Sequence, residues 1–125
     1  MRKDIDGQGM ETKALDPDFL RQCRVTFPPE RFMTDPSDCL PYGYDNSRRV
    51  ALPQAVAFAA THDEVVALVR SCHEHGVPLT ARGRGTNTTG ATVPVAGGVV
   101  LSLERMNRIL RTSPGDRFIE CEAGT

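Results

Sequence analysis

Apolar and polar positions in the middle of the chain predict a helix between two short strands. Residues 55–59 are apolar throughout, which is typical of a strand buried on both faces. Thr61 and Glu64 fit the capping box that opens a helix, and Gly76 is placed to end it. Between them, apolar residues recur at helical spacing on one face: Val65, Leu68, Val69 and Cys72. A second apolar run at residues 77–81 completes a β-α-β unit, for which we expect a right-handed crossover.

The residues before this unit have a weaker pattern. Residues 1–15 are polar and contain glycine, so we expect them to be frayed. A short helix is predicted from Asp16, an N-cap residue followed by proline, up to the two prolines at positions 28 and 29. Residues 30–47 are rich in Pro, Gly, Asp and Asn, which predicts a loop. Both tyrosines of the chain lie in this loop, and we expect them to anchor it.

The last part of the chain predicts a strand followed by a hairpin. Residues 98–103 are a third strand candidate, and residues 104–107 are expected to form one helical turn. Residues 109–112 and 117–122 flank the sequence Ser-Pro-Gly-Asp, which is a strong turn signal. Because polar and apolar residues alternate in the second arm, we expect a hairpin with one partly wet face.

A glycine-rich stretch from Arg82 to Gly90 follows the second strand of the β-α-β unit. It consists of three glycines, two arginines and four small polar residues. Glycine tolerates positive φ and lets a ligand approach the main chain, so consecutive N–H groups can form a nest for an anion. The carboxyl end of a parallel strand is also where open sheets bind ligands. The stretch therefore predicts a diphosphate-binding loop, with a flexible turn that binds nothing as the alternative.

Two common phosphate loops do not fit this stretch. The Walker pattern ends in Gly-Lys followed by Ser or Thr, and the stretch contains no lysine. The Rossmann pattern needs a third glycine where this chain has Thr88, and a helix directly after the loop. Pro94, Gly97 and Gly98 do not allow a long helix there. We therefore expect a strand, a glycine loop and then another extended segment.

Length and charge narrow the class of protein. The chain has 125 residues, which suits one domain or part of one, and its formal net charge is −1. This balance gives no electrostatic reason to expect nucleic acid or an anionic membrane as a partner. No apolar run approaches the roughly 20 residues that span a bilayer, and the polar N-terminus lacks the apolar centre of a signal peptide. We expect the cytoplasm, or a peripheral position on the inner membrane, as the location.

Cysteine and histidine spacing does not predict a metal site. The four cysteines are scattered without a Cys-x-x-Cys pair, so we expect reduced, partly buried thiols. His73 and His75 lie two residues apart on the predicted helix and face different directions, near the negative end of its dipole. His62, His73 and His75 are candidates for a catalytic role by residue type only, so no residue of this chain is assigned as catalytic.

The order of these motifs resembles the N-terminal part of FAD-linked oxidases of the p-cresol methylhydroxylase and vanillyl-alcohol oxidase type. Within that family, the glycolate oxidase FAD subunit and D-lactate dehydrogenases are the nearest in pattern. The resemblance runs from about residue 31 to residue 125. Its markers are Leu40-Pro41-Tyr42-Gly43-Tyr44-Asp45, the segment 55–81 with Cys72-His73, the start of the glycine stretch at 82–86, residues 99–110, and Glu122-Ala123-Gly124.

The resemblance implies an α+β fold, namely the FAD-binding domain of the p-cresol methylhydroxylase (PCMH) type. The chain would contain the first βαβ subdomain and the start of the second. Residues 1–30 would be a partly helical N-terminal extension, and residues 31–125 the N-terminal portion of the domain. Family members continue for several hundred residues, through a substrate cap. We therefore expect a chain truncated at its C-terminus, a fragment that is not active alone.

The resemblance also implies a cofactor and the residues that hold it. The FAD diphosphate would be bound by Arg82, Gly83, Arg84, Gly85, Thr86, Asn87, Thr89 and Gly90, and Gly124 would lie near the flavin. Some relatives attach FAD through a histidine in this loop. This loop has no histidine, so non-covalent FAD is expected. Arg84 replaces a small residue common in relatives and would add a charge beside the diphosphate.

Three hypotheses for function follow. The first is the FAD-binding part of an enzyme that oxidises a small D-2-hydroxyacid, glycolate or D-lactate, by hydride transfer to FAD, with electrons passing to an iron–sulfur partner subunit or a quinone. The second keeps the fold and changes the substrate, as in a cell-wall precursor reductase or a sugar-alcohol oxidase. The third is a non-catalytic remnant whose loop binds nothing tightly.

Overall fold

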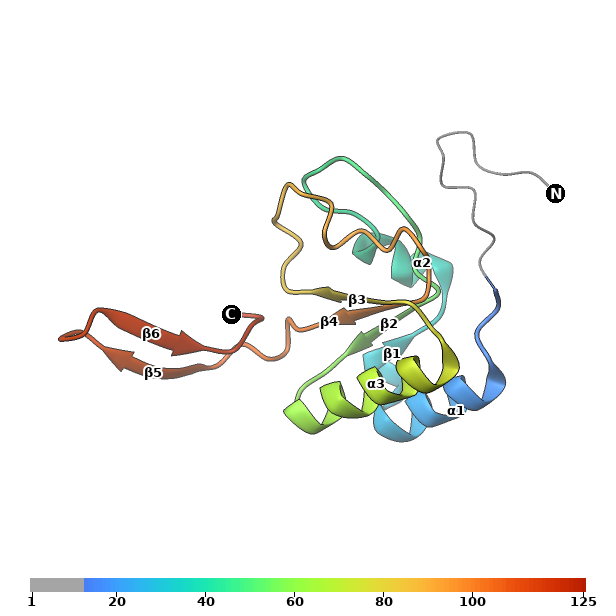
Figure 1. Ribbon diagram of the computed structural model, residues 1–125, viewed down its shortest axis with the longest axis horizontal. Helices are drawn as coiled ribbons and strands as arrows, with labels where there is room; N and C mark the ends of the chain where they lie inside the picture. The colour runs from blue at the N-terminus through green and yellow to red at the C-terminus, as the bar shows by residue number, and fades with distance from the viewer. Residues whose placement is uncertain (1–12) are drawn as a thin grey trace.

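A four-stranded sheet forms the centre of the body of the protein (Figure 1). The computed structural model describes residues 13–125, so most of the segment expected to be frayed lies outside the described residues. The strands in spatial order are β1 (Phe32–Met33), β2 (Ala55–Phe58), β4 (Val99–Ser102) and β3 (Leu79–Arg82). Strands β2, β4 and β3 run parallel, and β1 is antiparallel to β2. The predicted strands are confirmed, and β4 lies between the two strands of the β-α-β unit.

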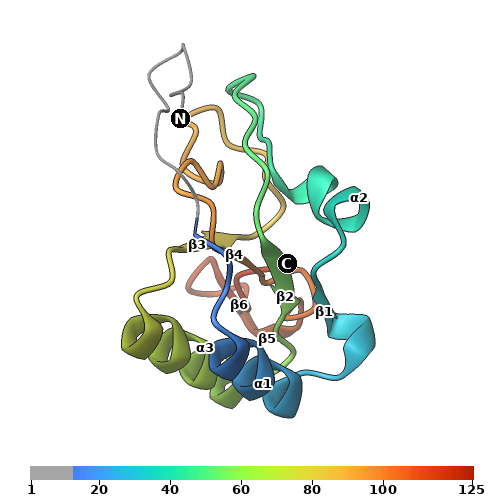
Figure 2. The same ribbon diagram turned by 90° about the vertical axis from the view of Figure 1, so that its right-hand side faces the viewer.

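Two helices pack together on one face of this sheet (Figures 1 and 2). Helix α1 spans Pro17–Thr26, and the side chain of its N-cap Asp16 accepts a hydrogen bond from the Asp18 N–H, as predicted. Helix α3 spans His62–His75, is capped by the Thr61 side chain, and ends at Gly76, whose φ of 63° is left-handed. Its buried face is centred on Leu68 and Cys72. The prediction that Val69 shares this face is wrong, because Val69 lies about 100° around the helix from Leu68 and is 45% exposed.

Alternation along β2 and β4 divides the core into two clusters. Ala55 and Ala57 of β2 and Leu101 of β4 lie on the side of the sheet that faces the two helices. They form one cluster with Phe19 and Phe27 from the N-terminal part of the chain. The other side of β2 and β4 packs against the segment around residues 33–42. Both strands are therefore buried on both faces, which explains their continuous apolar sequence.

The expected boundary after residue 30 remains a prediction about domain organisation. Helix α1 shares its core with the sheet, because Phe19 and Cys23 of this helix are buried against the same cluster as the strands. A bidentate ion pair then joins Arg31, the first residue after this boundary, to helix α3. The Arg31 guanidinium donates to both carboxylate oxygens of Glu64, at 2.6 and 2.8 Å, and to the carbonyl oxygen of Phe58 at 2.9 Å.

Two regions differ from the prediction. Residues 30–47 were expected to be a loop but contain short elements: η1 (Pro29–Arg31), strand β1, α2 (Pro36–Cys39) and η2 (Leu40–Tyr42). The dense prolines start these short elements and also prevent long ones. Residues 104–107 do not form a helical turn. A hydrogen-bonded turn from Met106 N–H to the Leu103 carbonyl redirects the chain there instead.

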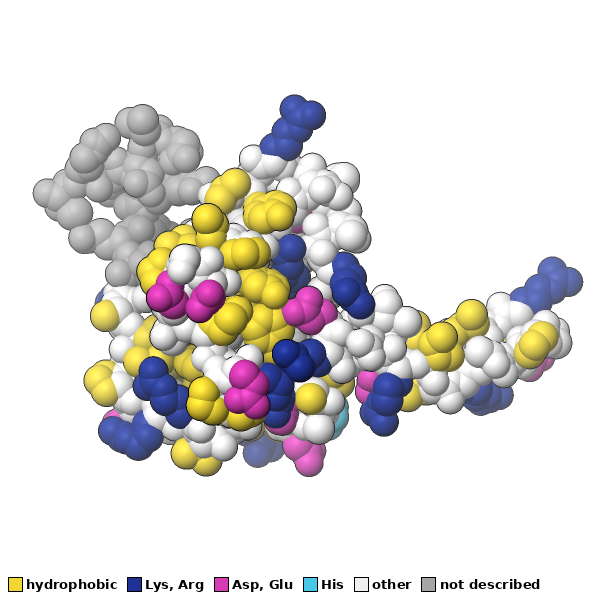
Figure 3. All heavy atoms as spheres, turned by 180° about the vertical axis from the view of Figure 1, so that it is seen from behind, with side chains coloured by type: hydrophobic (Ala, Val, Ile, Leu, Met, Phe, Trp, Pro, Cys, Tyr) yellow, Lys and Arg dark blue, Asp and Glu magenta, His cyan; other side chains and the backbone are white. Residues whose placement is uncertain are grey.

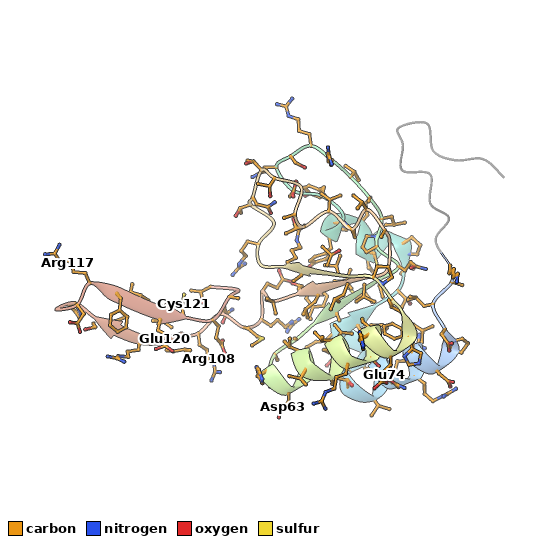
Figure 4. The ribbon with its side chains drawn as sticks, viewed as in Figure 1. Asp63, Glu74, Arg108, Arg117, Glu120 and Cys121 are labelled. Atoms are coloured by element: carbon orange, nitrogen blue, oxygen red, sulfur yellow. The ribbon has the colours of Figure 1, made fainter. Side chains whose placement is uncertain are left out.

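The predicted hairpin is confirmed and stands away from the body as a separate arm (Figure 1). It consists of β5 (Ile109–Ser113) and β6 (Phe118–Cys121), paired antiparallel, with a bulge between Ile109 and Arg111. Nearly every residue of the arm is exposed, so both of its faces are wet rather than one. In Figure 4, Arg108 lies at the base of the arm and Arg117 at its far end. Among the described residues, no helix has the length and apolar character needed to cross a bilayer.

Candidate cofactor site

The glycine-rich loop begins where three parallel strands end. Arg82 is the last residue of β3, and it pairs in register with Ser102 at the end of β4, which in turn pairs with Phe58 of β2. The loop therefore leaves the carboxyl edge of the sheet, as the sequence predicted. Since the carboxyl ends of parallel strands are the usual ligand-binding edge, this position favours a binding site.

Backbone N–H groups in this loop are available to a ligand. Within residues 13–125, no acceptor is recorded for the N–H groups of residues 83–90. Gly85 and Gly90 adopt positive φ values of 68° and 81°, which other residues reach only at a cost. These donors lie at or near the surface of the protein, where a ligand can reach them. A run of such donors is suited to an anion with several acceptor oxygens.

A second segment, residues 44–47, holds this loop in shape. The Asn46 N–H donates to the Asn87 carbonyl and the Asn46 side chain donates to the Thr86 carbonyl, both at 3.0 Å. Asp45 accepts from the Asn87 side chain at 2.8 Å and from the Thr92 hydroxyl at 3.2 Å. These bonds engage carbonyl and side-chain groups of the loop, so its N–H groups stay free.

Asp45 is the centre of this bracing network. Its side chain is buried, with only 4% of the residue exposed. Hydrogen bonds from Ser47, Asn87 and Thr92 hold the pKa of this carboxyl well below its usual value. Asp45 is therefore an acceptor-only carboxylate at neutral pH. The sequence analysis used it only as part of a family marker. The Asp-Asn-Ser turn signal at positions 45–47 was the available indication of a local hydrogen-bonding role.

The structure brings the second predicted segment against the glycine loop. The Arg84 side chain donates through Nε to the Gly124 carbonyl at 3.1 Å. A Cβ built on Gly83 would lie 3.3 Å from the carbonyl oxygen of Ala123. A Cβ on Gly124 would overlap the Leu103 carbonyl, so only glycine fits there. Residues from two distant parts of the sequence therefore meet at the base of the arm.

The predicted site residues divide into three groups. The backbone of residues 83–90 presents free N–H groups, and Gly124 lies beside them. Thr86 and Thr89 are exposed on the loop. The side chains of Arg82 and Asn87 instead point into the protein, where Asn87 donates to Asp45 and to Thr89. What these two residues can offer directly to a ligand is their main chain.

The cysteines lie outside this loop, and the three histidines belong to helix α3. Cys23, Cys39 and Cys72 are buried, and Cys121 lies exposed on the arm (Figure 4). Burial raises the pKa of the Cys23 thiol to about 12 and that of Cys72 to about 11, so both are protonated and unreactive at neutral pH. Among residues 13–125, no group of three or more Cys, His, Asp or Glu side chains is arranged to bind a metal ion.

Comparison with known proteins identifies related enzymes. A family model described as FAD binding domain matches residues 53–125. The glycolate oxidase subunit GlcD of Bacillus subtilis is 40% identical over 83 residues, which is 66% of this chain and 18% of that protein. A D-2-hydroxyglutarate dehydrogenase of Xanthomonas citri is 37% identical over 110 residues, covering 87% of this chain and 23% of the relative. A D-lactate dehydrogenase of Anaerostipes hadrus is 34% identical over 74 residues, covering 59% and 16%.

A solved structure shows the same fold. The crystal structure of p-cresol methylhydroxylase matches with a TM-score of 0.74 and 26% identity, over 86% of this chain and 22% of that one. The chain thus spans less than a quarter of the length of each of these proteins. The expected PCMH-type fold and the expected relatives are confirmed. This chain belongs to the FAD binding domain family of FAD-linked oxidoreductases, and FAD is its cofactor.

Proposed function

We propose that this chain supplies the diphosphate-binding loop of a flavoenzyme that oxidises a D-2-hydroxyacid. The observation that carries this proposal is the run of N–H groups at residues 83–90 that have no acceptor within the described part of the chain, at the carboxyl edge of the sheet and beside Gly124. The diphosphate of FAD would offer several anionic oxygens as acceptors. Hydrogen bonds to charged acceptors contribute roughly 1.5–3 kcal/mol each, so several would hold the cofactor without a covalent link.

The chain's own groups have separate roles in this proposal. The N–H groups of residues 83–90 bind the diphosphate, and the threonine hydroxyls at 86 and 89 can donate to it. Arg84 adds a positive charge while its Nε fixes the Gly124 carbonyl at 3.1 Å. Asp45 and Asn46 hold the loop open by engaging its other polar groups. When bound, FAD supplies the chemistry of accepting a hydride from the α-carbon of the substrate.

The binding mode that we propose is non-covalent. Residues 83–90 contain no histidine, cysteine or tyrosine that could be joined to the flavin. The proposal therefore places the whole affinity of this loop in hydrogen bonds and charge. Loss of the loop geometry should then release the cofactor rather than leave it attached.

The substrate and the electron acceptor belong to the proposal as well. Relatives carry the names glycolate oxidase subunit, D-lactate dehydrogenase and D-2-hydroxyglutarate dehydrogenase. Their printed substrates share a hydroxyl group on the carbon next to a carboxylate. We propose the same class of substrate for the protein to which this chain contributes. We propose an iron–sulfur partner subunit or a quinone as the electron acceptor. The name of one relative, glycolate oxidase subunit, favours a partner subunit but does not specify the acceptor.

Titration of the protein with FAD, followed by flavin fluorescence, tests the loop. Gly85→Val should abolish FAD retention, because Gly85 has φ of 68° and a Cβ there would overlap the Arg82 guanidinium. Gly115→Val is the matched control, since a Cβ on Gly115 at the tip of the arm meets nothing within 4 Å. Helix α3 should keep its circular dichroism signal in both variants. Normal FAD content in Gly85→Val would overturn the assignment of the loop.

A further inference from the structure

The Arg82 side chain is a buried cation beneath the glycine-rich loop. Only 8% of the residue is exposed, although arginine is among the residues least often buried. We propose that Arg82 is a positioning residue, which shapes the loop from below and supplies positive charge to the bound diphosphate through the loop. This inference rests on the proposed function, and it differs from the expectation that Arg82 contacts the cofactor directly.

Two tyrosines fix the place of the guanidinium. Nη1 of Arg82 donates to the Tyr44 carbonyl at 2.5 Å. The guanidinium carbon lies 5.7 Å from the centre of the Tyr42 ring and 6.0 Å from that of the Tyr44 ring. Tyr42 is itself anchored, because its ring packs edge-on against Phe58 with centroids 5.2 Å apart and its hydroxyl donates to Glu104 at 3.2 Å. The cation is therefore held by the body of the protein and not by the loop.

The loop passes directly over this fixed group. A Cβ built on Gly85 would overlap the Nη2 and Cζ atoms of Arg82. Gly85 is thus required at this position for two independent reasons, the positive φ of 68° and the lack of space. The guanidinium therefore lies directly beneath the peptide units at Gly85 and limits how closely they approach the body of the protein. Its position sets how far the loop can close and hence where its N–H groups point.

The structure shows no counter-ion for Arg82 among the residues that it describes. Among residues 13–125, no carboxylate forms an ion pair with Arg82, whereas Arg31 and Arg108 each have a glutamate. A buried charge without a partner is costly, so such groups are normally paired. The unpaired N–H groups of residues 83–90 lie in the same loop and have the same electrostatic sign. A single dianionic group on the outer side of the loop would compensate the charge of Arg82 and accept hydrogen bonds from these N–H groups.

Variants at Arg82 separate charge from shape. Arg82→Met removes the charge at similar length, Arg82→Lys keeps the charge but not the planar group, and Arg70→Met on the exposed side of α3 is the control for loss of one cation. The dissociation constant for FAD should rise about tenfold or more in Arg82→Met, less in Arg82→Lys, and negligibly in Arg70→Met. The dependence of FAD affinity on salt concentration should become weaker in Arg82→Met and stay near normal in Arg82→Lys. A purely structural role would not produce that difference.

A double-mutant cycle tests the contact with Gly85 without relying on FAD. Gly85→Ala should lower the free energy of unfolding, measured by urea titration, by more in the presence of Arg82 than the cost of positive φ alone. In an Arg82→Ala background, the same substitution should have a much smaller effect, because only the cost of positive φ remains. Additive effects of the two substitutions, or an unchanged salt dependence in Arg82→Met, would overturn the inference. If the parent protein does not bind FAD, the proposed function fails, and this cycle still decides whether Arg82 shapes the loop.

Discussion

The body and the arm of this protein contain strands of similar length with opposite surroundings. Strands β2 and β4 of the body are buried on both faces, between two helices and the segment around residues 33–42. Strands β5 and β6 of the arm are exposed on both faces. Figure 3 shows the arm projecting from the body, with apolar side chains on its surface. Hydrogen bonding between strands is thus common to both regions, and burial of apolar area is found only in the body.

The arm keeps its shape through local interactions. Arg108 forms an ion pair with Glu122 at 2.6 Å, and the guanidinium of Arg111 lies 4.8 Å from the centre of the Phe118 ring. At its base, the Gly124 N–H donates to the Met106 carbonyl at 2.9 Å. Two-stranded hairpins are marginally stable in water by themselves. The comparison teaches that a turn and a few side-chain pairs define a hairpin, whereas burial under helices is what stabilises the sheet of the body.

Removing one phenylalanine ring from each region should give the largest contrast. Phe19→Ala in the body should lower the free energy of unfolding by about 3–5 kcal/mol, because Phe19 is fully buried and its loss leaves a cavity. Phe118→Ala in the arm should cost less than about 1 kcal/mol, because the ring is already 38% exposed and leaves no enclosed cavity. Urea unfolding followed by circular dichroism measures both. Equal losses would show that the arm is packed against something in solution.

Breaking one ion pair in each region sharpens the comparison further. Glu64→Gln in the body should lower the free energy of unfolding by about 1 kcal/mol, since Arg31 binds both oxygens of Glu64 in a partly buried position. Glu122→Gln in the arm should have a smaller effect. The Glu122 side chain is only 9% exposed, but its partner Arg108 is 74% exposed, so water screens the guanidinium. The same urea experiment at low and high salt checks this. A larger salt dependence for the Glu64 pair than for the Glu122 pair would contradict the assignment.

Lowering the pH below about 4 should weaken the hydrogen bonds by which Asp45 holds the glycine-rich loop, whereas changes of pH near neutrality should have no effect on them. The folded pKa of Asp45 is below its usual value, so its contribution to stability is present above the ordinary pKa of aspartate, about 3.9, and is lost as the pH falls through the lowered value. Hydrogen exchange at Asn46 and Ser47, whose N–H groups donate to the Asn87 carbonyl and to the Asp45 side chain, should therefore rise as the pH is lowered from about 4 downwards, after correction for the intrinsic rate. Asp45→Asn should remove most of this pH dependence. An equally steep dependence in the variant would assign it to another carboxylate.

Local features of the structure were predictable because local chemistry determines them. Asp16 and Thr61 cap their helices as expected, and Gly76 ends α3, since each of these residues satisfies backbone groups within a few positions of itself. The apolar runs became β2, β3 and β4, and Ser-Pro-Gly-Asp became the turn of the arm. The glycine loop was placed correctly at the end of β3 for the same reason.

Predictions failed where exposure depends on distant parts of the chain. The alternation in β6 predicted one partly wet face, but the sequence does not say whether any layer covers the hairpin, and within residues 13–125 none does. Residues 30–47 have the composition of a loop, yet their prolines start short helices that cover one face of β2 and β4. Composition reports local preference, and packing decides whether that preference is realised.

By itself, the sequence determined the helix ends, the strands, the turn of the arm and the glycine loop with its implied FAD. Only the tertiary structure decided that β4 lies between β2 and β3, that Asp45 and Asn46 brace the loop, and that Arg82 lies beneath Gly85. Caps and turns depend on neighbours within about four residues, which a sequence displays directly. The bracing contacts join residues about 40 positions apart, and their partners are selected by the shape of the folded sheet.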